Sequence, residues 1–232
     1  MARNILILTG AGISAESGLG TFRDTGGMWS RYALEDVATP QGFARDPALV
    51  HHFYNARRAN CLAARPNAAH YALARLETDW PGRLTIVTQN IDDLHERAGS
   101  RAVIHMHGEV MRALCAACSH RWDAPPAMSR DLPCPACAAA ASRPDVVWFG
   151  EMPYHMDRIE TLLQQADLFV AIGTSGTVYP AAGFVEAARA MDIETLELTL
   201  EPSAASELFD EARHGPATRL VPDWANGLLS GN

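Results

Sequence analysis

The chain has 232 residues, of which 48% are hydrophobic and 20% are charged, as in a folded protein with one large α/β domain. Its formal net charge is −8, which argues against a nucleic-acid-binding groove because such grooves need a basic face. No apolar run is long enough for a signal-peptide core or a membrane span, so we expect a cytoplasmic protein that binds neither membrane nor nucleic acid.

Strand-like and helix-like segments alternate along most of the chain. The predicted elements are a strand at 4–9, helices at 47–61 and 67–78, strands at 84–88 and 102–106, a helix at 155–165, a strand at 168–172, a helix at 181–191 and a strand at 193–200. Asp46 and Pro47 supply the N-cap and the first residue of the first helix. Thr39-Pro40-Gln41-Gly42 is interpreted as a turn. The alternation predicts a parallel sheet with helices on both faces.

The first strand is followed by Gly10-Ala11-Gly12-Ile13-Ser14-Ala15, whose G-x-G-x-x-A spacing is allowed in dinucleotide-binding loops. Small residues let backbone N–H groups approach a pyrophosphate at a helix N-terminus. A tight strand-to-helix turn without a ligand would have the same spacing. An ordinary Rossmann unit returns to a second strand within about 30 residues, whereas the next strand here begins at Leu84. Hydride transfer is therefore disfavoured, although a dinucleotide remains the favoured ligand.

Polar segments follow several of the predicted strands. They are Gln89-Asn90-Ile91-Asp92, Gly173-Thr174-Ser175 and Glu201-Pro202. Each segment alone could simply cap a helix, but ligands of open α/β sheets bind at the carboxyl ends of strands, so together they predict a lined crevice. His107 follows the strand at 102–106 and is a candidate general base. A hydrogen-bonded structural histidine would fit the same position.

Cys115-Ala-Ala-Cys118 and Cys134-Pro-Ala-Cys137 are separated by fifteen residues. This spacing predicts a tetrahedral Zn²⁺ site, and four protein ligands would make that zinc structural rather than catalytic. Redox pairs or free thiols are the alternatives. The surrounding segment, 115–144, is rich in Cys, Pro and Ala and is too short to bury a core of its own, so it needs such a staple.

These motifs, together with Thr21-Phe22-Arg23 and His107-Gly108-Glu109, occur in an order that resembles the sirtuin family. The resemblance covers essentially the whole chain and is greatest to the bacterial CobB type, in class III. It implies one catalytic domain. A Rossmann-like parallel-sheet part would cover about 1–20, 66–108 and 145–232, and a small module would combine a helical segment, 21–65, with a zinc ribbon, 109–144.

By this resemblance, NAD and an acylated lysine of a protein or peptide would meet between the two parts. His107 would be the general base, and Asn90 and Asp92 would complete the catalytic set. The reaction would yield nicotinamide, free lysine and O-acyl-ADP-ribose. Thr199 stands where the family often has Asn. The residues implied to bind NAD are Gly10, Ala11, Gly12, Ile13, Ala15, Thr21, Phe22, Arg23, Trp29, Gln89, Asn90, Ile91, Asp92, Gly173, Thr174, Ser175, Thr199, Leu200, Glu201 and Ala217.

Tyr54 and Arg57 are spaced i, i+3 on the helix after Pro47 and share a face. Spacing alone fits a solvated charged face, because Arg58 adjoins Arg57. The resemblance implies instead the class III reader of acidic acyl groups such as succinyl and malonyl, with acetyl also accepted. The other residues implied to bind substrate are Ala38, Val147, Gly150 and Glu151. A protein ADP-ribosyltransferase, or a non-catalytic NAD- and zinc-binding protein, are the alternative functions, and we expect a monomer.

Overall fold

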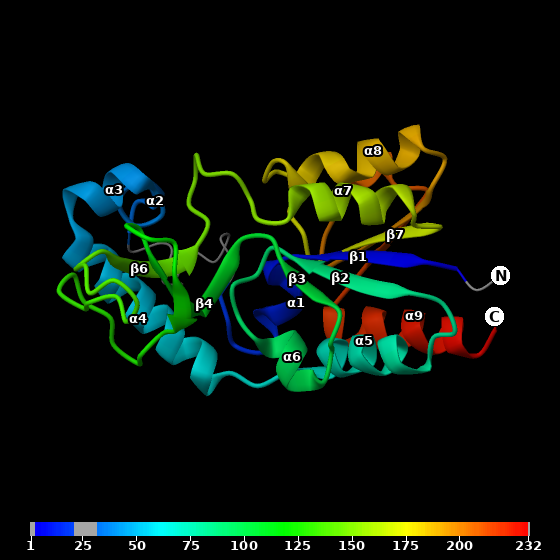
Figure 1. Cartoon of the computed structure of the whole chain (residues 1–232). Helices are drawn as coiled ribbons and strands as arrows, with labels where there is room; N and C mark the ends of the chain where they lie inside the picture. The colour runs from blue at the N-terminus through cyan, green and yellow to red at the C-terminus, as the bar shows by residue number, and fades with distance from the viewer. Residues whose placement is uncertain (1–2, 21–31, 232) are drawn as a thin grey trace.

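The computed structural model describes residues 3–20 and 32–231. Two parts lie side by side, a larger one that contains both described ends of the chain and a smaller one at the opposite end (Figure 1). No helix in these described ranges is both long and apolar enough to cross a membrane. The predicted positions Thr21, Phe22, Arg23 and Trp29 lie outside the described residues.

The larger part is built on a six-stranded parallel sheet in the order β3-β2-β1-β7-β8-β9. Its strands are β1 (Ile5–Thr9), β2 (Leu84–Thr88), β3 (Val103–His105), β7 (Leu168–Ile172), β8 (Glu194–Thr199) and β9 (Glu211–His214). The three central strands β2, β1 and β7 are buried at every position, as expected for a sheet covered on both faces. The prediction of a Rossmann-like parallel sheet is confirmed.

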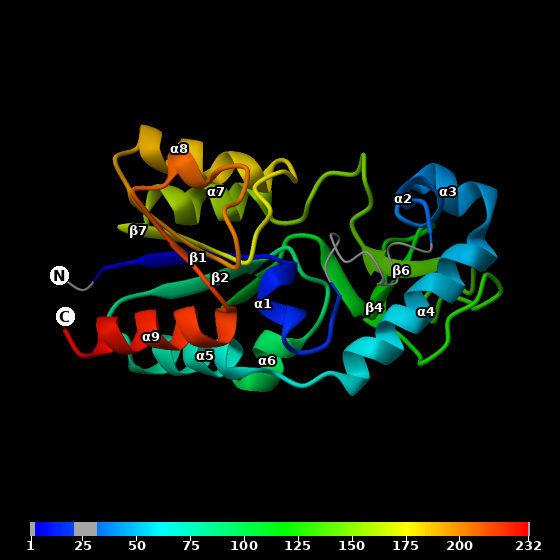
Figure 2. The same cartoon turned by 180° about the vertical axis from the view of Figure 1, so that it is seen from behind.

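Helices cover both faces of this sheet (Figures 1 and 2). One face carries α1 (Ala11–Ala15), α5 (Ala68–Asp79), α6 (Leu94–Ala98) and α9 (Ala217–Leu229), and the other carries α7 (Met156–Gln164) and α8 (Phe184–Ala190). Because side chains alternate along a strand, Ile5 and Ile7 pack into the α5–α9 core, whereas Leu6 and Leu8 pack into the α7–α8 core.

The smaller part combines two segments that are distant in sequence. The first forms α2 (Leu34–Val37), α3 (Pro40–Arg45) and α4 (Pro47–Ala63), and the second forms an antiparallel sheet of β4 (Gly108–Cys115), β5 (Arg121–Asp123) and β6 (Ser142–Val146) in the order β5-β4-β6. One apolar cluster joins the helices to the sheet; it includes Val50, Phe53, Val110 and Val146. Neither segment therefore encloses a core alone.

Most predicted elements are confirmed to within two residues at each end. The helix predicted at 181–191 begins with a 3₁₀ turn at Ala181–Gly183 and continues as α8. The turn predicted at Thr39-Pro40-Gln41-Gly42 is wrong, because Thr39 is the N-cap of α3, where its side chain accepts a hydrogen bond from the Gly42 N–H at 2.9 Å. A Thr-Pro pair opens a helix as readily as a turn, and Pro40 takes the first helical position.

Candidate active site

The glycine loop packs directly against the loop after β7. The Gly12 N–H donates to the Gly173 carbonyl at 2.9 Å, and a Cβ on Gly12 would lie 2.7 Å from the Gly173 Cα. Gly173 itself has a φ of +62°, and a Cβ there would lie 2.5 Å from the Ile13 nitrogen. These glycines allow two strand ends to approach more closely than side chains would permit. The spacing thus has a structural reason whatever ligand the loop binds.

A polar cluster joins the glycine loop to the segment after β2. The Asn90 amide nitrogen donates to the Gly10 carbonyl at 3.1 Å and to the Ser14 hydroxyl at 3.2 Å. The same hydroxyl donates to an Asp92 carboxylate oxygen at 3.2 Å. Burial raises the pKa of Asp92, and the hydrogen bonds from the Leu94 N–H and from Ser14 offset this only in part. The structure therefore brings together Ser14, Asn90 and Asp92, which come from two separate motifs.

Behind Ser14 lie two buried histidines, His70 and His95, to which the sequence motifs assign no role. His70 Nδ1 accepts from the Asn67 N–H at 3.3 Å, so the proton of the neutral ring lies on Nε2, which is 3.4 Å from the Ser14 hydroxyl. Burial lowers the pKa of His70 to about 4. The His95 ring lies 5.0 Å from that of His70, and its Nε2 is 3.0 Å from the Thr9 hydroxyl. His70 reaches Ser14 because it occupies the capping box of α5.

His107 and His105 lie on the same face, but their pKa values are shifted in opposite directions. His107 Nδ1 is 3.1 Å from the Gln89 carbonyl, so it must donate, and Nε2 of the neutral ring is left as an acceptor. Burial lowers the pKa of His107. Burial alone would also lower the pKa of His105, but Glu96, 2.7 Å from its Nε2, raises that pKa above the ordinary value. His107 is thus the residue of the pair suited to accept a proton near neutral pH.

On α4, Tyr54 is buried in the small module and Arg57 is partly buried. The Tyr54 hydroxyl is buried and accepts a hydrogen bond from Trp148 Nε1 at 3.1 Å. Burial lowers the pKa of the Arg57 guanidinium, while its electrostatic interactions with Tyr54 and Asp92 act in the opposite direction. The guanidinium lies 5.8 Å from the centroid of the Phe53 ring.

Arg58 also contradicts the solvated-face alternative, since its side chain is only 1% exposed. Its guanidinium donates to the Val110 carbonyl at 2.9 Å and to the Asn55 amide oxygen at 2.8 Å. Arg58 thereby ties α4 to β4 and has a structural role. Two adjacent arginines on one helix consequently face different surroundings.

The segment 147–151 connects His107 to the end of α2. The Val147 N–H donates to the His107 carbonyl at 2.9 Å, and the Phe149 N–H donates to the Ala38 carbonyl at 2.9 Å. Ala38 is buried, whereas Gly150 is exposed and has a φ of +89°. Val147 therefore adjoins the candidate base, and the next residue, Trp148, contacts Tyr54 of the α4 pair.

Glu151 is engaged within the chain. Its carboxylate accepts two hydrogen bonds from the Arg143 guanidinium, at 2.6 and 2.9 Å, and one from the Trp148 N–H at 2.8 Å. Burial alone would raise the pKa of Glu151, but these bonds hold it below the ordinary value. A peptide contact by this carboxylate would have to coexist with the ion pair.

The ends of β7 and β8 supply the remaining predicted positions. Thr199 is buried, and among the described residues no partner is present for its hydroxyl oxygen. Leu200 and Glu201 are exposed, and Ala217 is the first residue of α9. The predicted residues of the β7 end, Thr174 and Ser175, are partly buried. A buried hydroxyl without a partner beside exposed positions fits a polar ligand at this edge.

The four cysteines converge as predicted. The Sγ atoms of Cys115 and Cys137 lie 3.7 Å apart, those of Cys118 and Cys134 lie 3.7 Å apart, and all four lie within 4.8 Å of one another. A tetrahedral zinc with Zn–S bonds of about 2.3 Å separates its ligands by about 3.8 Å. The donor set therefore fits Zn²⁺, and it leaves no position for a catalytic water.

The two metal-binding turns have the same backbone. In each turn the residue after the second cysteine has a φ of 60°, as seen at Ser119 and Ala138. The Ser119 N–H donates to the Cys115 carbonyl and the Ala138 N–H to the Cys134 carbonyl, both at 2.9 Å. This repeated geometry directs two thiols from each turn at one centre.

Comparisons with known proteins identify the family. The Sir2 family model matches residues 10–180. An NAD-dependent protein deacylase of Caulobacter vibrioides is 60% identical over 97% of both chains. The chain belongs to the Sir2, or sirtuin, family. A Leishmania major protein of the same description is 52% identical over 98% of this chain and 96% of its own.

Solved Sir2 structures share the whole fold. A Sir2 homologue in complex with NAD is 36% identical, with a TM-score of 0.91 over 99% of this chain and 91% of its own. A mutant Sir2 homologue in complex with ADP-ribose has a TM-score of 0.92, at 36% identity over 99% of this chain and 93% of its own. The parallel sheet and the small module of this Sir2 protein are therefore those of the family.

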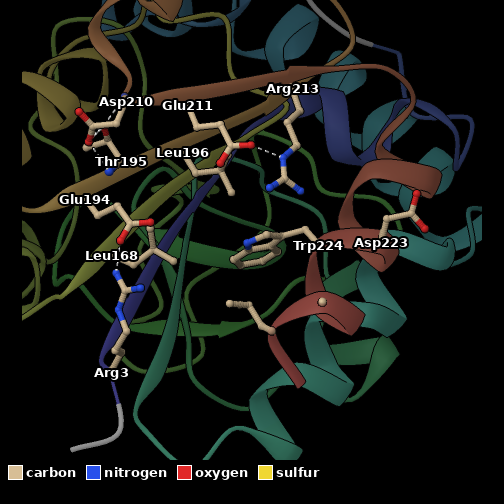
Figure 3. Close-up of a pocket in the computed structure, with 12 residues that line it drawn as sticks. Arg3, Leu168, Glu194, Thr195, Leu196, Asp210, Glu211, Arg213, Asp223 and Trp224 are labelled. Atoms are coloured by element: carbon tan, nitrogen blue, oxygen red, sulfur yellow. Dashed lines mark hydrogen bonds and ion pairs between the residues drawn. The ribbon is translucent and has the colours of Figure 1, made fainter. Parts of the chain in front are cut away.

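This Sir2 protein also has a hollow of about 470 Å³ at the amino ends of the strands, where β7 and β8 begin (Figure 3). Trp224 is among the residues that line it. Both of its arginines are already paired, Arg3 with Glu194 and Arg213 with Glu211, each at 2.6 Å. The candidate catalytic residues all follow the carboxyl ends of strands. We therefore assign no chemistry to this hollow.

Proposed function

We propose that this chain is an NAD-dependent protein-lysine deacylase that removes succinyl and malonyl groups, also accepts acetyl, and releases nicotinamide and O-acyl-ADP-ribose. The names of its relatives support deacylation. The observation that carries the acidic-acyl proposal is the position of Arg57 one turn after the buried Tyr54 on α4, with its guanidinium 5.8 Å from the centroid of the Phe53 ring. We further propose that it acts as a monomer on acylated-lysine proteins.

The NAD-binding edge would be formed by the glycine loop, the segment 89–92, the loop 173–175 and the end of β8. When bound, NAD supplies a ribose carbon that becomes electrophilic as nicotinamide departs. The Asn90–Ser14–Asp92 bonds hold the two loops in one arrangement, and the unpartnered Thr199 hydroxyl offers a polar contact. Preorganised polar groups of this kind reduce the cost of ordering a ligand.

His107 would hold or release a proton at Nε2. Its Nδ1–H is fixed on the Gln89 carbonyl, which sets both the tautomer and the ring orientation. Because its pKa is lowered by burial, the ring is neutral at physiological pH and can take a proton from a ribose hydroxyl.

Arg57 and Tyr54 would bind the distal carboxylate of a succinyl or malonyl group. A carboxylate accepts hydrogen bonds only, and a guanidinium and a phenol both supply donors. An acetyl group has no such carboxylate. Loss of the cation should therefore affect acidic acyl groups selectively.

The test is mass spectrometry of a succinyl-lysine peptide and its acetyl twin, incubated with the zinc-loaded protein with and without NAD. We expect NAD-dependent removal of both groups, with O-succinyl-ADP-ribose formed from the first. Arg57→Met should lower desuccinylation by more than about tenfold, the loss expected of a buried charged hydrogen bond, and spare deacetylation. The matched control is Arg65→Met, because Arg65 is exposed just after α4.

Equal loss of both activities in Arg57→Met would contradict the acyl-reader role. If only the acetyl peptide reacts with the wild-type protein, deacylation stands and the acidic-acyl proposal fails. If neither peptide reacts and ADP-ribose appears on protein, the ADP-ribosyltransferase alternative holds. NAD binding without nicotinamide release, unchanged in His107→Tyr, would indicate the non-catalytic alternative.

A further inference from the structure

The hydroxyl of Tyr54 has one of its two hydrogen-bonding roles already fixed. Trp148 Nε1 lies 3.1 Å from it, and an indole N–H can only donate. The phenolic oxygen therefore accepts, and its own hydrogen must be donated to another group. Among the residues that the structure describes, none accepts that hydrogen. A buried donor left over in this way points to a ligand that accepts.

Trp148 is itself held in place from several sides. Its side chain is 2% exposed, and the Arg143 guanidinium lies over its ring at 3.5 Å from the centroid. Arg143 is fixed in turn by its two bonds to Glu151 and by one to the Val146 carbonyl at 2.8 Å. A cation over the ring face makes the indole edge a better donor. The direction of the Trp148 N–H is thus set before any substrate arrives.

This arrangement lies next to the cation of the proposed acyl pocket. Tyr54 and Arg57 are on α4, Trp148 follows β6, and α4 lies beside β6 in both views (Figures 1 and 2). Arg57 lies one helical turn after Tyr54, on the same face of α4. If the phenolic oxygen were not occupied by the indole, it could accept from Arg57, and the tyrosine would then compete for the cation instead of assisting it.

We propose that Trp148 is a specificity-determining positioning residue that makes Tyr54 a hydrogen-bond donor toward acyl groups ending in a carboxylate. This inference rests on the proposed acidic-acyl function and names what organises that pocket. An acetyl group requires no donor from Tyr54, so the effect of the Trp148 N–H is confined to acidic acyl groups. Arg143 and Glu151 support it indirectly, by fixing the indole.

Trp148→Phe tests the proposal, because it keeps an aromatic ring under Arg143 and removes only the N–H donor. We expect kcat/KM for a succinyl-lysine peptide to fall about fivefold to tenfold, through KM, as for the loss of one hydrogen bond that contributes to binding. The acetyl twin should change by less than about twofold. Trp122→Phe is the matched control, since Trp122 lies on β5 and stacks on His120.

A double-mutant cycle with Tyr54→Phe separates positioning from packing. In the Tyr54→Phe background, Trp148→Phe should have no further effect on the succinyl-to-acetyl ratio. Tyr54→Phe alone should reproduce the succinyl-specific loss with Trp148 intact, so the proposal remains testable if Trp148→Phe folds poorly. Equal losses on both peptides, or additive effects of the two substitutions, would overturn it. A wild-type protein without desuccinylation would instead refute the underlying function.

Discussion

Gly173→Ala tests the close contact between the two strand ends. Gly173 has a φ of +62°, and a Cβ would lie 2.5 Å from the Ile13 nitrogen and 2.7 Å from the Gly12 carbonyl carbon. The left-handed backbone costs an alanine about 1 to 2 kcal/mol. Displacing packed backbone adds about 1 to 3 kcal/mol. Since about 1 kcal/mol shifts the Tm of a chain this size by about 2 to 4 °C, we expect Gly173→Ala to lower it by about 10 °C.

Gly150→Ala is the matched control, because Gly150 has a φ of +89° and no atom lies within 4 Å of its added Cβ. It should lower the Tm by about 3 to 6 °C, from backbone strain alone. Calorimetric melting of the ligand-free variants gives both values, and titration with NAD should show weaker binding only for Gly173→Ala. If the two alanines cost the same, the contact does not require glycine and this reasoning is refuted.

Three further predictions concern buried polar groups of the site. The acidic limb of the pH profile of kcat/KM should lie below pH 6.5. Protonation of His107 removes the base, and burial lowers the pKa of His107 below its ordinary value. A measured limb above pH 6.5 would contradict this. Stability should fall as the pH drops from 6.5 toward 4, since His70, with a folded pKa of about 4, binds its proton more readily when unfolded. The difference in His70 pKa contributes about 3 kcal/mol to the free energy of unfolding between pH 6.5 and pH 4. Chemical unfolding of His70→Gln should therefore show a stability that depends less on pH than that of the wild-type protein. An equal pH dependence in both proteins would argue against this role of His70. Thr199→Val should raise the free energy of unfolding of the ligand-free protein by about 1 kcal/mol, because the buried hydroxyl has no partner among the described residues. Calorimetric titration should also show weaker NAD binding. An unchanged affinity for NAD would exclude a contact between NAD and the Thr199 hydroxyl.

The parallel sheet and the zinc site were predictable because each depends on local sequence. Central strands such as Leu84–Thr88 are short apolar runs, and the cysteine spacing encodes the metal-binding turns. The last helix, α9, was not predicted, because Pro222 interrupts its pattern in the sequence although the structure keeps it helical. The edge strand β9 is exposed at all four positions and has no apolar signal.

The sequence motifs propose which residues form the candidate site, but they do not predict the contacts between those residues. Spacing could not distinguish Arg57 from Arg58, since burial of Arg58 depends on β4 and on Asn55, which the chain brings together only in the folded module. His70 and Ser14 are 56 residues apart, and no local pattern pairs them. Long-range contacts of this kind depend on tertiary packing rather than on propensity.

The position of β4 gives the zinc site a consequence for catalysis. His107 immediately precedes this strand and Cys115 ends it, so the metal and the candidate base belong to one continuous piece of backbone, about 26 Å long at about 3.3 Å per residue. A chelator that removes zinc would release the far end of that strand without entering either substrate site. Inhibition by metal depletion should therefore be noncompetitive with both NAD and peptide, and added zinc should reverse it.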